Sequence, residues 1–224
     1  MTKIISQNTV DKENQIKKWQ STFYIGDKNA KIRIAIVGNS ITFHAIKEDI
    51  GWNKNCGMAA SDELHDYVHL LFEKLTADGL DVCLMVNQLS YWEGHYRENV
   101  NDNYRNIKDF QPDYLIFRLG ENIDAVDTND IAEHIQKLLV DITANKTNVV
   151  MTTNFWENEI IDQAIRLIAK KNDYPLVELS DLGNDETMRA TGLYEHKGVA
   201  CHPGDKGMEN IAYRIFECLK IQLK

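Results

Sequence analysis

Proline and glycine are scarce in this sequence, and long apolar runs are missing. The 224 residues include 3 prolines and 12 glycines, and 43% of the residues are hydrophobic. This composition excludes collagen-like repeats and disordered, low-complexity chains, and it is typical of a globular protein. Basic residues are also in deficit, because 25 Lys and Arg stand against 34 Asp and Glu, for a formal net charge of −9. Nucleic acid and anionic membrane surfaces are therefore unfavourable partners on electrostatic grounds.

Metal-binding and disulfide patterns are missing as well. The four cysteines, at positions 56, 83, 201 and 218, follow no zinc-site or CxxC spacing. His65 and His69 have the i, i+4 spacing of a helical zinc pair, but no third ligand accompanies them, so we expect no metal and no other cofactor. No stretch has the apolar character of a signal peptide or a membrane span. Together with cysteines expected to be reduced, this predicts a cytoplasmic protein.

Short apolar runs, rich in β-branched residues, recur along the chain. They are Ile32–Val37, Val82–Val86, Tyr114–Phe117, Val149–Met151 and, more weakly, Leu176–Leu179. Runs without strict alternation are typical of parallel strands that are buried on both faces. Segments with helical periodicity separate them, with apolar stripes that begin at Leu64, Ile131 and Ile161, and a last stripe that begins at Ile211.

This alternation predicts an α/β protein in which a mainly parallel sheet of five strands forms the middle of a three-layer α/β/α sandwich. Ser61 is expected to cap the helix after the first strand and Gly79 to end it, and Asp205 has the position of a cap for the last helix. We expect one domain over residues 31–224 and an N-terminal extension, residues 1–30, that packs on its outside.

Polar residues follow the expected strands directly. Ser40 follows the first run, Asn122 follows the third, and His202 precedes the last helix. The carboxyl ends of parallel strands meet at one edge of a sheet, so these residues form a constellation suited to acyl transfer. Each also has a simpler interpretation: Ser40 as a helix cap, Asn122 as a turn residue and His202 as a surface or packing residue.

The segment Gly38-Asn39-Ser40-Ile41-Thr42 resembles the Gly-Asp-Ser motif of the SGNH (GDSL-type) hydrolases, with Asn where the family usually has Asp. Gly120-Glu121-Asn122 resembles the Gly-x-Asn block of that family, and His202 resembles its last block. The resemblance covers residues 32–224, and it implies a flavodoxin-like three-layer fold and hydrolysis of an ester or related acyl bond. It further implies that Ser40 is the nucleophile and His202 the general base. The oxyanion hole would consist of the Ser40 N–H, a glycine N–H and the Asn122 side chain.

The group that orients His202 is left open by the sequence. The family usually has an acid three residues before the histidine, where this chain has Val199. Asp205 is the nearest carboxylate in the sequence, and Glu195 is the next alternative. A backbone carbonyl is the third possibility, and it would leave a Ser–His dyad.

The oxyanion glycine is also displaced from its usual place. Gly94 is the only glycine in the region that follows the second strand, and it lies several residues beyond that strand. Ser90, or another backbone N–H nearby, is the alternative donor.

Four further residues are expected at the same edge as a binding surface for substrate. Trp92 and Trp156 would stack on the apolar face of a sugar ring, while Glu93 and Asn154 would bind its hydroxyl groups. The long segment Ile50–Ser61 is expected to form a wall of the pocket, because long connections inside compact domains are often functional.

The sequence therefore predicts a serine esterase that cleaves a short acyl ester, with an O-acetylated carbohydrate as the preferred small-molecule substrate. One alternative is a catalytically silent ligand-binding module on the same fold. Others are an acyl hydrolase of the lipase or thioesterase type and a flavodoxin-like nucleotide or flavin binder. The sequence does not indicate an oligomeric state.

Overall fold

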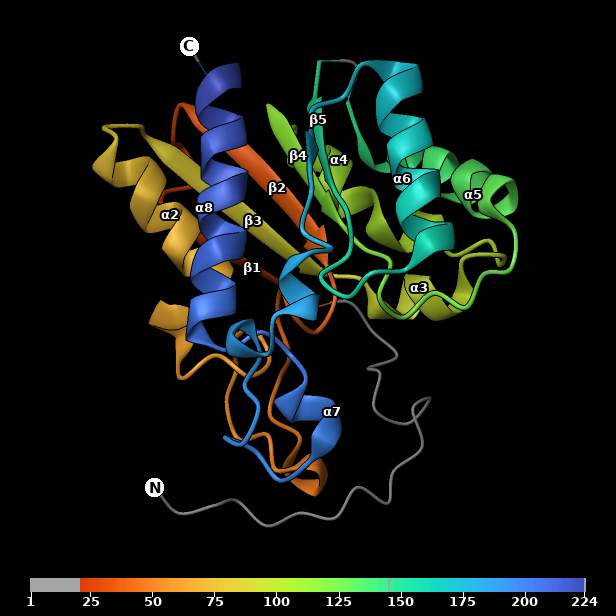
Figure 1. Ribbon diagram of the computed structural model, residues 1–224. Coiled ribbons are helices and arrows are strands. Elements are labelled where there is room, and N and C mark those ends of the chain that lie inside the picture. Colours follow the sequence, from red (N-terminus) through yellow and green to blue (C-terminus); the bar gives the residue numbers. More distant parts are fainter. Residues whose placement is uncertain (1–20, 145, 224) are drawn as a thin grey trace.

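A single twisted sheet forms the centre of the molecule, as seen in the computed structural model (Figure 1), which describes residues 21–144 and 146–223. Within these residues the sheet has six strands in the order β1-β3-β2-β4-β5-β6. Their bounds are Ser21–Ile25 (β1), Ile32–Gly38 (β2), Val82–Gln88 (β3), Tyr114–Arg118 (β4), Asn148–Thr152 (β5) and Leu176–Val177 (β6). Strands β2 to β6 run parallel to one another, and the edge strand β1 pairs antiparallel with β3.

All the apolar runs identified in the sequence form strands, although the weakest of them, β6, is only two residues long. The edge strand β1 was not expected, so the sheet has one strand more than predicted. It comes from the segment expected to pack outside the domain, where Ser21 to Ile25 instead pair with Gln88 to Leu84. Residues 1–20 of the expected extension lie outside the described residues.

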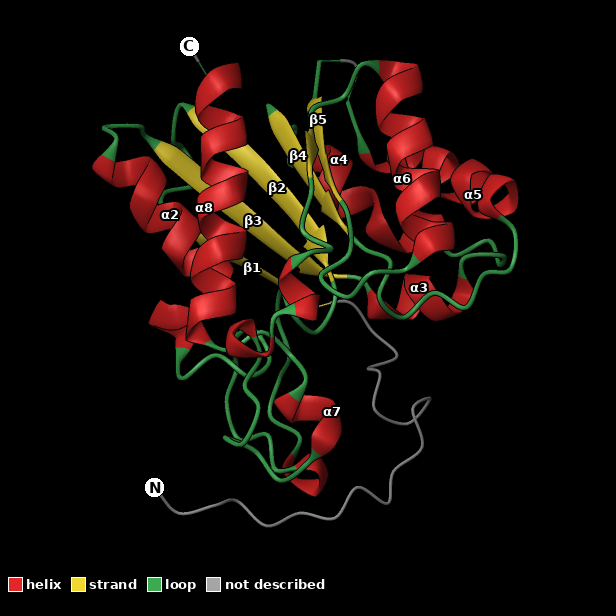
Figure 2. Cartoon of the chain, in the orientation of Figure 1, coloured by secondary structure: helices red, strands yellow, loops and turns green. Residues whose placement is uncertain are grey.

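Helices cover both faces of the sheet and make the molecule a three-layer α/β/α sandwich (Figure 2). On one face α2 (Tyr67–Ala77) and α8 (Asp205–Gln222) lie side by side. On the other face α5 (Thr128–Ile142) packs against α6 (Glu159–Asn172), close to the short helices α3 (Ser90–His95) and α4 (Arg105–Asp109). The shortest helix, α7 (Lys197–Ala200), lies in the segment that leads into α8. In the described part of the chain, five single 3₁₀ turns cover Glu48–Ile50, Glu63–His65, Asn101–Tyr104, Leu182–Asn184 and Glu186–Met188.

The two faces of β2 explain why its sequence does not alternate. Ile34 and Ile36 belong to the hydrophobic core under α2 and α8, whereas Ala35 and Val37 belong to the core under α5 and α6. Successive side chains of a strand point to opposite faces, so a strand covered on both sides needs apolar residues at every position.

Two of the predicted helix caps are wrong. The helix α2 is capped by Asp66, whose carboxylate accepts the N–H of His69, and not by Ser61. Gly204 occupies the cap position of α8, so Asp205 is the first helical residue. The carboxylate of Asp205 instead accepts the N–H of Ser61 at 2.7 Å. Gly79 does follow the end of α2, with a positive φ of 85° that favours glycine.

The carboxyl ends of the parallel strands meet at one edge of the sheet, where the long loops of the molecule also gather (Figure 2). This is the edge at which ligands bind in open parallel sheets. Among the helices that the structure describes, none is long and apolar enough to cross a membrane.

Candidate active site

Ser40 lies in a tight turn directly after β2. The turn needs glycine at its start, because a Cβ atom at Gly38 would collide with the side chain of Thr42. The carbonyl oxygen of Asn39 then accepts the N–H groups of Thr42 and Phe43, each at 3.0 Å. No helix begins here, so the interpretation of Ser40 as a helix cap is wrong, and the turn presents its hydroxyl at the edge of the sheet.

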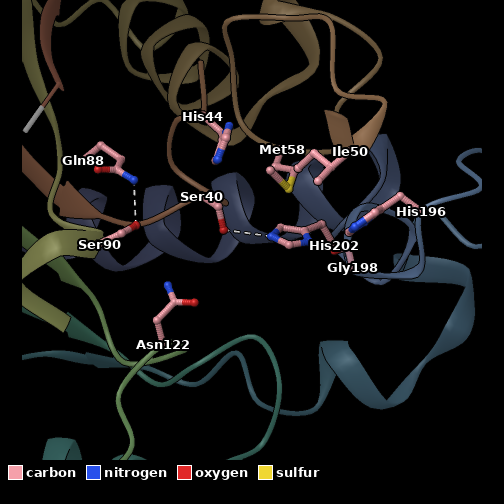
Figure 3. A pocket seen from close by; sticks show the side chains of 10 residues that line it. All are labelled: Ser40, His44, Ile50, Met58, Gln88, Ser90, Asn122, His196, Gly198 and His202. Atoms are coloured by element: carbon pink, nitrogen blue, oxygen red, sulfur yellow. Dashed lines mark hydrogen bonds between the residues drawn. The ribbon is translucent and has the colours of Figure 1, made fainter. Parts of the chain in front are cut away.

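The side chains of Ser40 and His202 meet, although 162 positions separate them in the sequence. The Oγ atom of Ser40 lies 2.8 Å from Nε2 of His202 (Figure 3). On the other side of the ring, Nδ1 of His202 lies 2.6 Å from the carbonyl oxygen of Gly198 in α7. A carbonyl oxygen can only accept, so Nδ1 carries the proton and Nε2 of the neutral ring is free to accept the proton of Ser40.

Burial keeps this imidazole neutral. It lowers the pKa of His202 to about 3, while the hydrogen bond to Gly198 acts in the opposite direction and the nearby Arg118 adds to the lowering. The ring of Trp156 packs edge-on against the imidazole, with 5.1 Å between the ring centroids. His202 is therefore in its basic form at neutral pH. The hydrogen bond to Gly198 and the contact with Trp156 fix the orientation of its ring.

Neither candidate carboxylate orients the imidazole. Asp205 was expected as one possible triad acid, but its carboxylate is bonded to the N–H of Ser61. Glu195 is exposed to solvent. The carbonyl of Gly198 occupies the orienting position, so the geometry is that of a dyad with a backbone partner.

Asn122 lies in the same pocket as Ser40 and His202. Its amide nitrogen points toward the space between Ser40 and Ser90 (Figure 3). Ser90 is the first residue of α3, where the N–H groups have no acceptor within the helix, and its Oγ accepts a hydrogen bond of 2.6 Å from Gln88. Gly94, in contrast, lies further along α3 and is exposed, with open space where a Cβ would be. The expectation that Gly94 contributes to the oxyanion hole is wrong.

A buried polar network lies directly behind this pocket and is centred on Asn39. The Nδ2 atom of Asn39 donates to Glu93 at 3.0 Å and to Glu121 at 2.6 Å, and its Oδ1 accepts from Arg118 at 3.2 Å. Arg118 also forms an ion pair with Glu121. The second oxygen of Glu93 accepts from Asn122 at 2.6 Å. Burial and the charge of Glu121 raise the pKa of Glu93 to about 7.

None of the four residues expected to bind substrate lines the pocket. Trp92 is fully buried in the core, where its indole N–H donates to Asn101. Glu93 faces the network behind the pocket, and Asn154 is buried against Gly120. Trp156 lies beside the catalytic candidates, but its indole N–H donates to the carbonyl of Cys201 and its ring packs on the imidazole. Trp92 is therefore a core residue, and Trp156 is a partly buried neighbour of the imidazole that does not line the pocket.

The pocket itself is small. Its cavity volume is about 70 Å³, and its walls include Ile50 and Met58 from the segment expected to form a wall. One water molecule needs roughly 10–15 Å³ by this measure. The space therefore suits a group of a few heavy atoms better than a long acyl chain.

His196 is a pocket residue for which the sequence gives no signal. Its Nδ1 accepts the N–H of Val199 at 3.1 Å and so caps α7. Burial lowers the pKa of His196, so the ring is neutral and its proton is on Nε2. This Nε2 is buried and has no hydrogen-bond partner among the residues that the structure describes, which places an unused donor beside the candidate dyad.

Of the three groups considered for orienting His202, the structure has the backbone carbonyl, although the sequence did not indicate that Gly198 supplies it. The sequence missed the network around Asn39, which draws on three separate segments of the chain. His65 lies in the 3₁₀ turn before α2 and His69 in α2, and each imidazole is bonded to an aspartate, Asp62 and Asp66 respectively. In the described part of the chain, no group of three or more His, Cys, Asp or Glu residues has the arrangement of a metal site.

No protein-family model and no curated protein sequence matches this chain. Solved structures do resemble it. One is a psychrotrophic esterase from Pseudoalteromonas sp., in a structure inhibited by monoethylphosphonate, with a TM-score of 0.58 and 13% identity over 85% of this chain and 98% of that one. A lipase/acylhydrolase from Enterococcus faecalis has a TM-score of 0.57 and 13% identity over 85% and 96% of the two chains. A family 3 carbohydrate esterase from Clostridium thermocellum has a TM-score of 0.58 and 17% identity over 85% and 96%.

At these identities the similarity concerns the fold. The chain has the three-layer α/β/α fold of the SGNH hydrolases, which confirms the resemblance drawn from its motifs at the level of architecture.

Proposed function

We propose that this protein is a serine esterase that hydrolyses short acyl esters. The single observation that carries the proposal is the 2.8 Å contact between Oγ of Ser40 and Nε2 of His202, on a ring whose Nδ1 is bonded to the Gly198 carbonyl. A serine hydroxyl is too weak an acid to attack an ester unaided, so it needs a base in the correct tautomer within hydrogen-bond distance.

In the first half of the reaction, Oγ of Ser40 attacks the ester carbonyl carbon while its proton passes to Nε2 of His202. The tetrahedral intermediate collapses when the bond to the alcohol oxygen breaks, and the imidazolium gives its proton to that oxygen. In the second half a water molecule attacks the acyl-serine, with its proton taken by the same Nε2. The carboxylic acid then leaves as Ser40 regains a proton.

The orienting partner in this scheme is a carbonyl dipole and not a carboxylate. Gly198 holds the ring in position and fixes the proton on Nδ1, but it carries no full charge to stabilise the imidazolium. Burial disfavours the charged ring and lowers the pKa of His202, and no full charge at Gly198 offsets this effect. The imidazolium therefore releases its proton to the leaving group readily.

The oxyanion hole of the proposal consists of the Ser40 N–H, the Ser90 N–H and the Asn122 side chain. Ser90 and Asn122 line the pocket on the side facing Ser40 (Figure 3). Donors that are already aimed at the developing oxyanion contribute about 10²–10³ each in rate.

The cavity supports a short acyl group such as acetyl. Its volume of about 70 Å³, with Ile50 and Met58 among its walls, favours a short acyl group over the fatty chain of a lipase or long-chain thioesterase substrate. For the alcohol half we keep an O-acetylated carbohydrate. Its support is the unused Nε2–H donor of His196, which suits a sugar oxygen, and the carbohydrate esterase among the similar folds.

Hydrolysis of 4-nitrophenyl esters of increasing chain length tests the proposal. We expect the highest kcat/KM with acetate, a steep decline beyond butyrate, and loss of turnover in Ser40→Ala. Cys201→Ala is a matched control, because its thiol adjoins His202 but lies 3.9 Å from Nδ1 and not at Nε2. Turnover that is unchanged in Ser40→Ala would overturn the proposal, and a wild-type protein that hydrolyses none of these esters would favour the silent binding module. A bound chromophore in the purified protein would favour the flavin-binding alternative.

A further inference from the structure

Glu93 is a buried carboxylate that the proposed reaction does not use. It is almost inaccessible to solvent, and it lies in α3 immediately behind the pocket. Its Oε1 accepts the N–H of Gly120 at 2.7 Å and Nδ2 of Asn39 at 3.0 Å, and its Oε2 accepts Nδ2 of Asn122 at 2.6 Å. Each of these partners is a neutral N–H donor, so this carboxylate fixes the orientation of the groups around it.

We propose that Glu93 is a positioning residue for the oxyanion hole, and that its carboxylate holds the amide of Asn122 with the nitrogen, rather than the oxygen, toward the pocket. The inference rests on the proposed esterase function. An ionised carboxylate can only accept hydrogen bonds, so Asn122 must present Nδ2 to it. One hydrogen of that nitrogen is bonded to Glu93, and the second remains for the oxyanion of the substrate.

The backbone at Gly120 makes this arrangement specific. Gly120 has a φ of 147°, in the region that favours glycine, and a Cβ there would collide with the side chain of Asn154. This conformation turns the N–H of Gly120 into the same carboxylate that holds Asn122 two residues later. Glu93 therefore fixes both ends of the loop that carries the oxyanion donor.

Protonation of Glu93 would reverse the polarity of this contact. A protonated carboxyl group donates from one oxygen, and Asn122 could then satisfy it only by turning its own carbonyl oxygen inward. The substrate oxyanion would meet a carbonyl oxygen and not an N–H group. The state of Glu93 thus decides which atom of Asn122 serves the reaction.

The charges around Glu93 place its protonation close to neutral pH. Glu121 is the nearest like charge, and its effect adds to burial in raising the pKa of Glu93 to about 7. Arg118 is the cation of the network, but it pairs with Glu121 and with the amide oxygen of Asn39. No direct ion pair of Glu93 is seen in the described part of the chain, so its charge is balanced only by neutral donors.

The same network explains why Asn stands at position 39, where the SGNH hydrolases usually have Asp. The Nδ2 of Asn39 donates to Glu93 and to Glu121, so an aspartate there would place a third carboxylate against two others. The amide at position 39 and the carboxylate at position 93 are therefore two parts of one arrangement.

A double-mutant cycle with Glu93→Gln and Asn122→Ala tests the inference on the esterase activity. In Glu93→Gln the new amide mimics the protonated acid, so we expect kcat to fall about 100-fold with KM changed by less than a few-fold. We expect the kcat of Asn122→Ala to fall by a similar factor. The kcat of the double variant should be no lower than that of Asn122→Ala alone. The acidic limb of the kcat/pH profile, with a midpoint near 7, should vanish in Glu93→Gln. Additive losses in the cycle, or a limb that persists, would overturn the inference.

A readout independent of activity keeps the two proposals separate. The side-chain NH₂ resonances of Asn122, assigned by their loss in Asn122→Ala, should titrate in the wild-type protein with the midpoint expected of Glu93. They should not titrate in Glu93→Gln. If Ser40-dependent turnover is missing but this titration is seen, the esterase proposal fails while the coupling of Glu93 to Asn122 stands. If turnover depends on Ser40 and the resonances do not titrate, the role of Glu93 is refuted alone.

Discussion

The Nδ1 atom of His202 lies 2.6 Å from the carbonyl oxygen of Gly198, on the side of the ring opposite Ser40. The group that orients the proposed base is thus a peptide carbonyl in the short helix α7. This helix is capped by His196, which also lines the pocket. One seven-residue segment, 196–202, therefore supplies the base, its orienting group and a further donor.

Replacement of Asp205 by Asn should leave the reaction intact. The carboxylate of Asp205 is bonded to the N–H of Ser61 and not to the imidazole, so we expect kcat/KM to change by less than about threefold. Glu195→Gln is the matched control for the other candidate acid and should behave in the same way. A loss near 10⁴-fold, as follows loss of a true triad acid, would instead identify Asp205 as the orienting group.

Replacement of Asn39 by Asp should destabilise the protein in a pH-dependent manner. The new carboxylate would face Glu93 and Glu121, so its pKa in the folded state should be raised above its unfolded value, as the pKa of Glu93 already is. An acid with a raised folded pKa contributes stability at low pH that is lost as the pH rises through that pKa.

We therefore expect Asn39→Asp to be less stable than Asn39→Ala by about 3 kcal/mol at pH 8. Asn39→Ala loses the same hydrogen bonds without adding charge. Urea denaturation from pH 5 to 8 measures the difference, which should shrink toward pH 5. A difference that does not depend on pH would mean that charge repulsion is not its cause.

Truncation of Met58 to Ala should relax the preference for short acyl groups. Met58 is buried, and it lines the pocket together with Ile50. Each added methylene that finds space gains about 1 kcal/mol, so the ratio of kcat/KM for butyrate, which has two more methylenes, over acetate should rise about 30-fold. Leu71→Ala in α2 is the control, because it removes a buried side chain of the same core but does not line the pocket. An unchanged ratio in Met58→Ala would place the acyl group elsewhere.

Replacement of His196 by Asn should separate capping from substrate binding. The Asn side chain can still accept the N–H of Val199 and cap α7, but it lacks the Nε2–H donor in the pocket. With an acetylated xyloside we expect KM to rise about tenfold, because one buried hydrogen bond to the substrate is lost. The Tm should stay within a few degrees of the wild-type value. An equal effect on 4-nitrophenyl acetate would show that the donor does not contact the sugar half.

The parts of the site that the sequence predicted are those that strand order determines. Ser40, Asn122 and His202 each follow or precede an element whose position at the edge of the sheet is set by parallel topology. The edge strand β1 escaped prediction because Ser21–Ile25 is short and mixes polar and aromatic residues, and only its pairing with β3 reveals it.

The direction of individual side chains could not be predicted in this way. Trp92 and Glu93 are neighbours in one helical turn, and only their packing shows that one enters the core and the other the network behind the pocket. Which group orients His202 had to come from the structure, since every residue carries a backbone carbonyl whatever its side chain.

Covalent trapping of Ser40 tests the central claim most directly. After treatment with a 4-nitrophenyl organophosphonate, peptide mass spectrometry should find one adduct, on the peptide that contains Ser40. The adduct should be lost in Ser40→Ala and form at least about 10³-fold more slowly in His202→Ala, because the base is then missing. An adduct on another residue, or an equal rate of labelling without His202, would contradict the claim that these two side chains share the proton of the reaction.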